Sequence, residues 1–291
     1  MSPNEYCHQK ASASGSSFYY SFLFLPQAQR SAITALYAFC REVDDVVDEC
    51  SEPQLAQIKL QWWREEIQQT FAGSARHPVT QALQPCLSTF DLPIEHFLEI
   101  IDGMQMDLEQ TRYQCFDDLA SYCYRVAGVV GLMSAAIFGF RDPATMDYAR
   151  DLGTALQLTN ILRDLREDAA RGRIYIPEDE MRQHEVNPED ILNLRDSENL
   201  RALLTFQAQR AHRYYEQALR QLPDEDRYRQ RGGLIMAQIY RTILREIERD
   251  GFQVMKRRVA LTPVRKLWIA WRTARREKRI SKRHQRQASK E

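Results

Sequence analysis

Apolar residues recur at helical spacing through most of the chain. In residues 27–49 they fall three or four positions apart, which places on one face Ile33, Leu36, Tyr37, Cys40, Val43 and Val47. Other segments have the same period, and some open with Pro or close with Gly, as helices do. The pattern predicts further helices over 53–73, 91–111, 116–140, 142–172, 197–222 and 232–252.

One of these segments, 116–140, differs from the rest because it is nearly apolar from Val126 onward. A helix that is apolar on all sides is buried. The same segment has small residues that would let another backbone come close, namely Gly128, Gly131, Ser134 and Ala135. We therefore expect it to be a central helix of the fold.

The composition agrees with a folded, mostly helical protein. Of 291 residues, 44% are hydrophobic and 27% are charged, which excludes a disordered chain. Gly and Pro number only 11 each, and strand-like alternation is scarce, so the fold class is all-α. No internal repeat or interdomain linker is evident, and we expect one domain over residues 1–271.

Charge is unevenly distributed although the net charge is zero. Residues 256–291 hold 14 of the 40 Lys/Arg but only two of the 40 Asp/Glu. The tail 272–291 is basic and poor in hydrophobic residues, and this composition predicts disorder. The six cysteines show neither C-x-x-C pairing nor a histidine at zinc spacing. Such reduced cysteines are typical of a cytoplasmic protein.

Two segments carry pairs of acids at a spacing of four. Asp44 and Asp48 lie in "REVDDVVDE" (41–49), and Asp164 and Asp168 lie in "TNILRDLREDAARGRIYIP" (159–177). Residues four apart share a face of a helix, about 6 Å apart along its axis. One such pair alone is most simply a solvated surface. Two pairs, each beside an apolar stripe and an arginine, can face each other across a helical bundle.

Clustered carboxylates require a positive charge. Two of them about 4 Å apart repel each other by roughly 4 kcal/mol at an effective dielectric near 20. Oxygen ligands without histidine favour Mg²⁺, whose coordination is usually completed by water and substrate phosphate. Arg41, Arg163 and Arg173 can bind the same phosphates through bidentate contacts. The combination predicts a magnesium–diphosphate site.

Four blocks resemble the signature blocks of the squalene/phytoene synthase family, and they come in the family's order. They are "SSFYYSFLFLP", "ALYAFCREVDDVVDE", "YCYRVAGVVG" and "QLTNILRDLREDAARGRIYIP". The resemblance covers about residues 7–260 and implies an isoprenoid-synthase-type helical bundle with a central apolar cavity. Within the family the chain looks closest to bacterial presqualene diphosphate synthases of hopanoid pathways, chiefly through "GSSFYYSFLFLP".

The resemblance also assigns roles to residues. It implies that the metal ligands are Asp44, Asp48, Asn160, Asp164 and Asp168, and that the four aspartates are also catalytic. Tyr122 would lie beside the reacting carbons. Diphosphate contacts would come from Arg41, Arg163, Arg173, Gln157, Tyr240 and Arg257. The chain departs from the family pattern at Ser16, where some members have a cation, and at Val47, where squalene synthases often have an acid. Its extra acid is instead Asp45, about 100° around the helix from Asp44.

The expected reaction is the Mg²⁺-dependent, head-to-head condensation of two farnesyl diphosphates to presqualene diphosphate. One alternative is a phytoene synthase, which would use two geranylgeranyl diphosphates in a deeper tunnel. Another is a squalene synthase, which needs a hydride from NADPH, and the chain has no G-x-G-x-x-G. A head-to-tail prenyltransferase or terpene cyclase has different blocks. A non-catalytic helical assembly factor of the same fold would have lost acids that are all present here.

The basic tail suggests a second partner. "VRKLWIAW" (264–271) places two tryptophans directly before "WRTARREKRISKRHQR" (271–286). Basic runs also bind nucleic acids, but tryptophans beside Arg and Lys are typical of a membrane-interface anchor. Because the substrates are also greasy, we expect an anionic membrane surface as the partner and no nucleic acid. The protein would then be cytoplasmic and peripheral at the inner face of the membrane.

Overall fold

The computed structural model describes residues 1–13, 17–50 and 52–288, and their side chains up to residue 283. Ser16 lies outside these residues. The helices are α1 (Pro3–Ala13), α2 (Ser17–Phe22), α3 (Gln27–Glu49), α4 (Pro53–Phe71), α5 (Pro78–Leu87), α6 (Ile94–Glu109), α7 (Phe116–Cys123), the π-helical turn η1 (Tyr124–Gly128), α8 (Val129–Phe138), α9 (Ala144–Arg163), α10 (Leu165–Ala170), α11 (Glu178–Gln183), α12 (Pro188–Leu192), α13 (Glu198–Gln221), α14 (Arg231–Arg249), the 3₁₀ turn η2 (Gln253–Met255) and α15 (Pro263–Ala288). The all-α prediction is confirmed, since every regular element in the described ranges is a helix.

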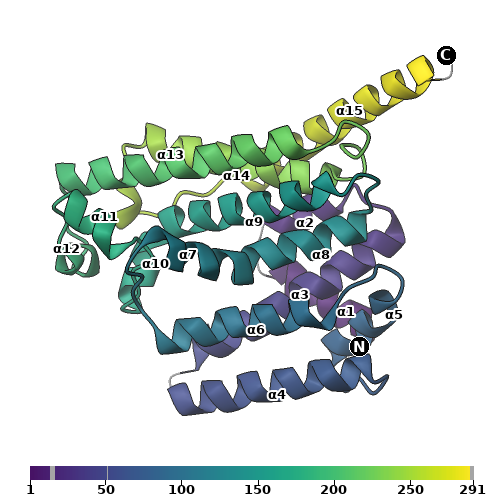
Figure 1. Ribbon diagram of the computed structural model, residues 1–291, viewed down its shortest axis with the longest axis horizontal. Coiled ribbons are helices and arrows are strands. Elements are labelled where there is room, and N and C mark those ends of the chain that lie inside the picture. The colour runs from purple at the N-terminus through teal and green to yellow at the C-terminus, as the bar shows by residue number, and fades with distance from the viewer. Residues whose placement is uncertain (14–16, 51, 289–291) are drawn as a thin grey trace.

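The long helices lie in layers with their axes nearly side by side. In Figure 1, α4 and α6 form the lower edge, α13 and α14 the upper edge, and α8 and α9 lie between them. Most predicted helices are present with ends shifted by one to three residues, and 27–49 is present with the same bounds. The short helices α1, α2, α5, α11 and α12 were not predicted, because they have too few turns for their apolar residues to show a clear period.

Two predicted helices are interrupted. The segment 116–140 divides into α7, η1 and α8, and its backbone packs directly on α9. A Cβ atom on Gly131 would lie 2.2 Å from the carbonyl oxygen of Ala149, and one on Gly153 would lie 2.3 Å from that of Ala127. The expected close approach of a second backbone is therefore confirmed.

The segment 142–172 was predicted as one helix, and this prediction is wrong. Asp164 ends α9 and precedes α10, with φ −101° and ψ 12°. Asp is a weak helix former that favours helix ends. Ion pairs with two arginines hold its side chain at this break.

Apolar side chains form two buried clusters. The first joins α1, α3, α4, α5 and α6, and includes Leu36, Phe39 and Phe97. The second joins α9, α13 and α14, and includes Tyr148 and Tyr215. The segment Phe116–Phe138 has the length and apolar character of a membrane-spanning helix. It is the central segment of this arrangement and contributes residues to both clusters.

The tail prediction is corrected by α15, which continues to Ala288 across the expected boundary at 271/272. Lys, Arg and Gln are good helix formers. One face of α15 is also buried, at Ile269, Ala270 and Thr273. Glu277 on the same face accepts hydrogen bonds of 3.1 and 3.2 Å from Arg227. Composition alone hid this buried face, because charged residues surround it.

Candidate active site

A cavity of about 690 Å³ lies between the two apolar clusters. Its apolar part is lined by residues of α2, α3, η1, α8, α9 and α14, among them Phe18, Phe22, Ile33, Leu36, Val126, Val130, Phe138, Leu152 and Met236. Its polar part is lined by Arg41, Asp44, Asp48, Asp107, Tyr122, Gln157, Asn160, Arg163, Asp164, Asp168, Arg171, Arg173 and Arg258. The predicted central apolar cavity is therefore present, and charged groups occupy part of its wall.

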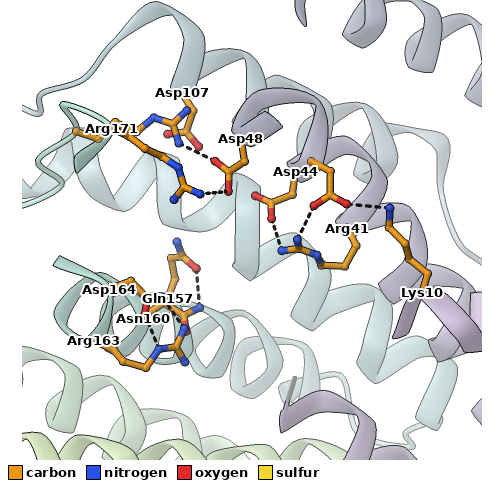
Figure 2. A network of polar contacts seen from close by, with 12 residues as sticks. Lys10, Arg41, Asp44, Asp48, Asp107, Gln157, Asn160, Arg163, Asp164 and Arg171 are labelled. Carbon is orange, nitrogen blue, oxygen red and sulfur yellow. Dashed lines mark hydrogen bonds and ion pairs between the residues drawn. The ribbon is translucent and has the colours of Figure 1, made fainter. Parts of the chain in front are cut away.

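The first pair of acids projects from the last turns of α3. Arg41 donates a hydrogen bond of 2.5 Å to Asp44 and a second, shorter one to Asp45. Asp48 is paired with arginines that follow α10, at 3.0 Å from Arg173 and 3.4 Å from Arg171. Figure 2 shows Arg171 reaching across to Asp48 from the opposite side of the site. Ion pairs thus join the two acidic segments, which are distant in the sequence.

Asp45 points away from the cavity, as its angular position on the helix predicts. It pairs with Lys10 of α1 at 2.8 Å, and Lys10 also pairs with Glu42 at 3.0 Å. Because Arg41 also bonds Asp45, the N-terminal helix holds the guanidinium of Arg41 at the edge of the site.

The second acidic segment lies across the break between α9 and α10. Asp164 accepts hydrogen bonds of 2.8 and 2.5 Å from Arg163, and Arg258 donates another of 2.6 Å. The amide of Asn160 donates to Gln157 at 3.2 Å. Asp168 makes no ion pair or side-chain hydrogen bond with another described residue. Arginines therefore pair with Asp44, Asp48 and Asp164, whereas Asp168 has no such partner among the described residues.

Burial and mutual repulsion raise the pKa values of two of the acids. Burial, together with Asp48, raises the pKa of Asp44 to about 7 although Arg41 opposes the shift. Asp44 is 35% exposed, but it lines the cavity, so the enclosing protein rather than bulk water sets its pKa. Burial and the neighbouring Asp164 raise the pKa of Asp168 to about 8. Burial would also raise the pKa of Asp164, but hydrogen bonds from Arg163 and Arg258 outweigh it and the pKa is lowered.

These donors suit a hard cation only when other ligands complete the shell. No three Asp, Glu, His or Cys side chains among the described residues lie close enough together to hold a metal ion. The Oδ1 atom of Asn160 is buried and has no hydrogen-bond partner among the described residues, so an oxygen ligand is left unused. Carboxylate and amide oxygens without histidine fit Mg²⁺, provided that substrate oxygens and water supply the remaining positions.

Tyr122 lies where the charged part of the cavity meets the apolar part. Its hydroxyl donates a hydrogen bond of 2.9 Å to Asp107 of α6, and the hydroxyl of Tyr175 donates one of 2.7 Å to the other oxygen of the same carboxylate. Burial raises the pKa of Asp107 to about 6. Burial and the adjacent Asp107 raise the pKa values of both tyrosines well above the usual range, so both phenols remain protonated.

The structure brings nearly all predicted site residues to the cavity. Gln157 and Tyr240 line it, with the guanidinium of Arg163 lying 5.8 Å from the ring of Tyr240. Arg257 is the exception, because its side chain is 69% exposed and pairs with Asp250 outside the cavity. Arg258, the next residue, bonds Asp164 instead. The prediction that Arg257 lines the site is therefore wrong by one position. Residues 256–262 are not helical, so no periodicity in the sequence indicates which side chains point toward the cavity.

Sequence reasoning also missed several lining residues. Arg171 and Tyr175 lie within a block that carries the resemblance, so their type and position were available as a signal. Asp107 has no acid three or four positions away on α6, so no sequence pattern distinguishes it from a surface acid. Lys266 of α15 also lines the cavity.

Comparison with known proteins finds relatives that match most of the chain. The family model for squalene/phytoene synthase matches residues 11–265. The 15-cis-phytoene synthase of Synechococcus elongatus is 40% identical over 90% of this chain and 89% of its own, and the phytoene synthase of Arthrospira platensis is 38% identical over the same shares of the two chains. A dehydrosqualene synthase crystal structure has a TM-score of 0.84 at 27% identity and covers 95% of this chain and 96% of its own.

A second solved structure, squalene synthase HpnC from Alicyclobacillus acidocaldarius, has a TM-score of 0.77 at 30% identity and covers 86% of this chain and 94% of its own. The match of the family model covers most of the chain and contains both acidic segments, Tyr122 and the residues that line the cavity between them. The chain belongs to the squalene/phytoene synthase family.

Proposed function

We propose that this protein is a phytoene synthase, which joins two geranylgeranyl diphosphates head to head. The observation that carries this choice is the group of relatives named phytoene synthase, which are 34–40% identical over most of this chain. Our sequence-based expectation was the C15 substrate, and these relatives favour its C20 alternative. The N-terminal block that suggested farnesyl diphosphate does not measure the depth of the cavity.

The arginines of the cavity bind the two diphosphates. In the structure, Arg41, Arg163 and Arg173 neutralise Asp44, Asp164 and Asp48. When a diphosphate enters with its counter-ions, each guanidinium exchanges a carboxylate for phosphate oxygens, which it binds in the same bidentate geometry. The ion pairs therefore keep the arginines ordered and close to the positions in which substrate requires them.

Mg²⁺ would be held by Asp44, Asp48, Asn160, Asp164 and Asp168 together with the diphosphate. When bound, it neutralises charge that builds up on the departing diphosphate. The binding of cations also removes the carboxylate repulsion that adds to the effect of burial in raising the pKa values of Asp44 and Asp168. Metal and substrate are therefore expected to bind together.

The apolar part of the cavity holds the isoprenoid chains. Departure of the diphosphate leaves an allylic carbocation, which water would trap at once, and the apolar walls keep water away from it. Tyr122 presents its phenol where the charged and apolar parts meet, and Asp107 fixes that phenol by the 2.9 Å hydrogen bond. The phenol thus lies beside the cation, with its orientation set from α6.

The atoms of the reaction balance without a redox partner. The double bond of the second substrate attacks the cation, and loss of a proton closes a cyclopropane. Departure of the second diphosphate, rearrangement and loss of another proton give phytoene. Two C20 diphosphates therefore yield one C40 hydrocarbon, two diphosphates and two protons, and no hydride is needed. A squalene synthase would require a reductant at the last step.

The second candidate is formation of presqualene diphosphate from two farnesyl diphosphates, followed or not by the NADPH-dependent step to squalene. The similarity to squalene synthase HpnC and to the dehydrosqualene synthase favours it, since both solved structures cover most of the chain. The third alternative, a non-catalytic assembly factor, is disfavoured because all four aspartates line one cavity.

Incubation of the full chain with each substrate separates these candidates. Farnesyl and geranylgeranyl diphosphates are supplied separately with Mg²⁺, with and without NADPH, and the products are identified by mass. We expect phytoene from the C20 substrate, with and without NADPH alike. Presqualene diphosphate or squalene from the C15 substrate, at a higher kcat/KM than phytoene formation, would overturn the proposal. No product from either substrate would favour the assembly factor.

A further inference from the structure

The outward face of α15 carries an apolar stripe. Val264, Leu267, Trp268 and Trp271 are 78%, 46%, 53% and 47% exposed. At about 100° per residue these four side chains fall within one third of the helix circumference. The packed side of α15, at Ile269, Ala270, Thr273 and Glu277, lies on the opposite side. The stripe is therefore the part of α15 that faces away from the protein body.

The remainder of the exposed surface of α15 is positively charged. Nine Lys or Arg lie between Arg265 and Arg283, against the single acid Glu277, which is buried and bonded to Arg227. The guanidinium of Arg272 lies 5.1 Å from the ring of Trp268, and that of Arg275 lies 5.1 Å from the ring of Trp271. Among the described residues, none of the basic side chains from Arg272 to Arg283 forms an ion pair.

Arg275, Lys278 and Lys282 continue the line of the apolar stripe along the helix. The exposed surface is thus apolar near the protein body and basic toward the C-terminus. In Figure 1 the C-terminal part of α15 extends beyond the other helices, so its basic surface is accessible from outside.

We propose that this face of α15 docks on an anionic lipid surface. Tryptophans and aliphatic side chains enter the headgroup region, while the basic side chains beside them remain at the phosphate level. Each basic residue near an anionic leaflet strengthens binding about fivefold. Because the cytoplasmic leaflet is the anionic one, the protein would be a peripheral protein of the inner face of the membrane.

Charge distinguishes α15 from the other exposed apolar stripe. Leu55, Ile58 and Trp62 are exposed along α4. However, α4 carries two basic and two acidic residues, so it has no net attraction to an anionic surface. The stripe on α4 therefore serves as a matched control.

Docking would also place the cavity beside the lipid. Leu261, just before α15, and Lys266, in its first turn, line the cavity wall. The apolar stripe begins at Val264 on the same helix. An apolar substrate or product would then have a short path between cavity and bilayer. The docking proposal does not depend on which diphosphate the cavity accepts.

The test is sedimentation of the full chain with vesicles of phosphatidylcholine, alone or mixed with phosphatidylglycerol, at low and high salt. We expect binding only to the anionic vesicles, weakened by salt. Trp268→Ser combined with Trp271→Ser should lower the partition constant about tenfold or more. Replacing Arg272, Arg276 and Lys278 by Gln should lower it about 100-fold. The control Leu55→Ser with Ile58→Ser should change nothing, and circular dichroism checks that each variant is folded.

A second readout follows the tryptophans directly. Their fluorescence should shift to the blue with anionic vesicles in the parent and in the α4 control, and not in the variant without Trp268 and Trp271. Equal binding to neutral vesicles, or equal binding by the tryptophan variant, would overturn the proposal. So would tighter binding to duplex DNA than to lipid, or a lipid-free dimer that the tryptophan substitutions dissociate.

Discussion

Asp107 of α6 accepts a 2.9 Å hydrogen bond from the phenol of Tyr122, and with its second carboxylate oxygen it accepts another from Tyr175. One carboxylate therefore fixes two aromatic side chains that stack at a ring separation of 5.1 Å. The three groups lie at the border of the charged and apolar parts of the cavity. We infer that Asp107 acts by positioning Tyr122.

If so, Asp107→Asn and Tyr122→Phe should each lower kcat, by about 10- to 100-fold, because misplacing a group at the reacting centre has effects of this size. The double variant should be no slower than the slower single variant, since both changes disrupt one hydrogen-bonded unit. Tyr113→Phe is the control, because Tyr113 packs on both rings without bonding Asp107. Additive losses in the double variant would contradict a shared role.

The acids of both segments should be needed for turnover but not for folding. Asp48→Asn and Asp164→Asn are each expected to lower kcat about 10²- to 10³-fold, as loss of a charge stabiliser does. Higher Mg²⁺ should restore part of the activity. Asp102→Asn, which removes a partly buried ion pair with Arg64 outside the cavity, is the matched control. Near-normal rates in the first two variants would show that these carboxylates do not hold the metal.

The adjacent residues Arg257 and Arg258 offer a sharp comparison. Arg258 bonds Asp164 at the cavity, whereas Arg257 pairs with Asp250 outside it. Arg258→Gln should lower kcat/KM about 10- to 100-fold, which corresponds to the loss of one charged hydrogen bond. Arg257→Gln should leave it within about twofold. Steady-state kinetics of the two variants would refute this assignment if Arg257→Gln were as slow as Arg258→Gln.

Without metal, the protein should become less stable as the pH rises from 6.5 to 8.5. The pKa of Asp168 is raised to about 8 and that of Asp44 to about 7, whereas an unfolded Asp has a pKa near 3.9. Up to these pH values the folded protein still holds protons that the unfolded chain has already lost, and the decline ends above the pKa of Asp168. The free energy of unfolding therefore falls, by at most about 1.4 kcal/mol per pH unit for each group.

Thermal denaturation in the presence of a chelator measures this effect. Asp168→Asn should flatten the decline of the melting temperature with pH, and Asp102→Asn should not. Mg²⁺ added with inorganic diphosphate should stabilise the protein more at pH 8.5 than at pH 6.5, since the bound cation favours the ionised carboxylates. Identical pH slopes for the parent and Asp168→Asn would mean that Asp168 is not responsible.

The sequence predicted those parts of the fold that depend on local periodicity. The helix 27–49 and its two aspartates follow from an apolar stripe that is visible without any tertiary information. The break between α9 and α10 at Asp164 does not follow from local periodicity. The side chain of Asp164 is held there by Arg258, a residue distant in the sequence. The close contact of 116–140 with the backbone of α9 is likewise a tertiary feature.

In the candidate site too, the sequence predicted the residues that belong to a local pattern and missed those that depend on tertiary contacts. Pairs of acids four apart form a pattern, so Asp44, Asp48, Asp164 and Asp168 could be found. Asp107 lacks a partner on its own helix, and its role depends on two hydroxyls from other segments. The outer face of α15 was also hidden, since a composition rich in Arg and Lys does not show which side of a helix is buried.

The contact between η1–α8 and α9 limits how the specificity of this enzyme can evolve. Gly131 and Gly153 both line the cavity, and a side chain on either would collide with a carbonyl group of the facing backbone. Selection for a longer or shorter isoprenoid therefore cannot act at these two positions. It must act on the remaining walls, where Phe22, Ile33 and Met236 come from α2, α3 and α14. Family members that use isoprenoids of different length should share the two glycines and differ in the side chains opposite them.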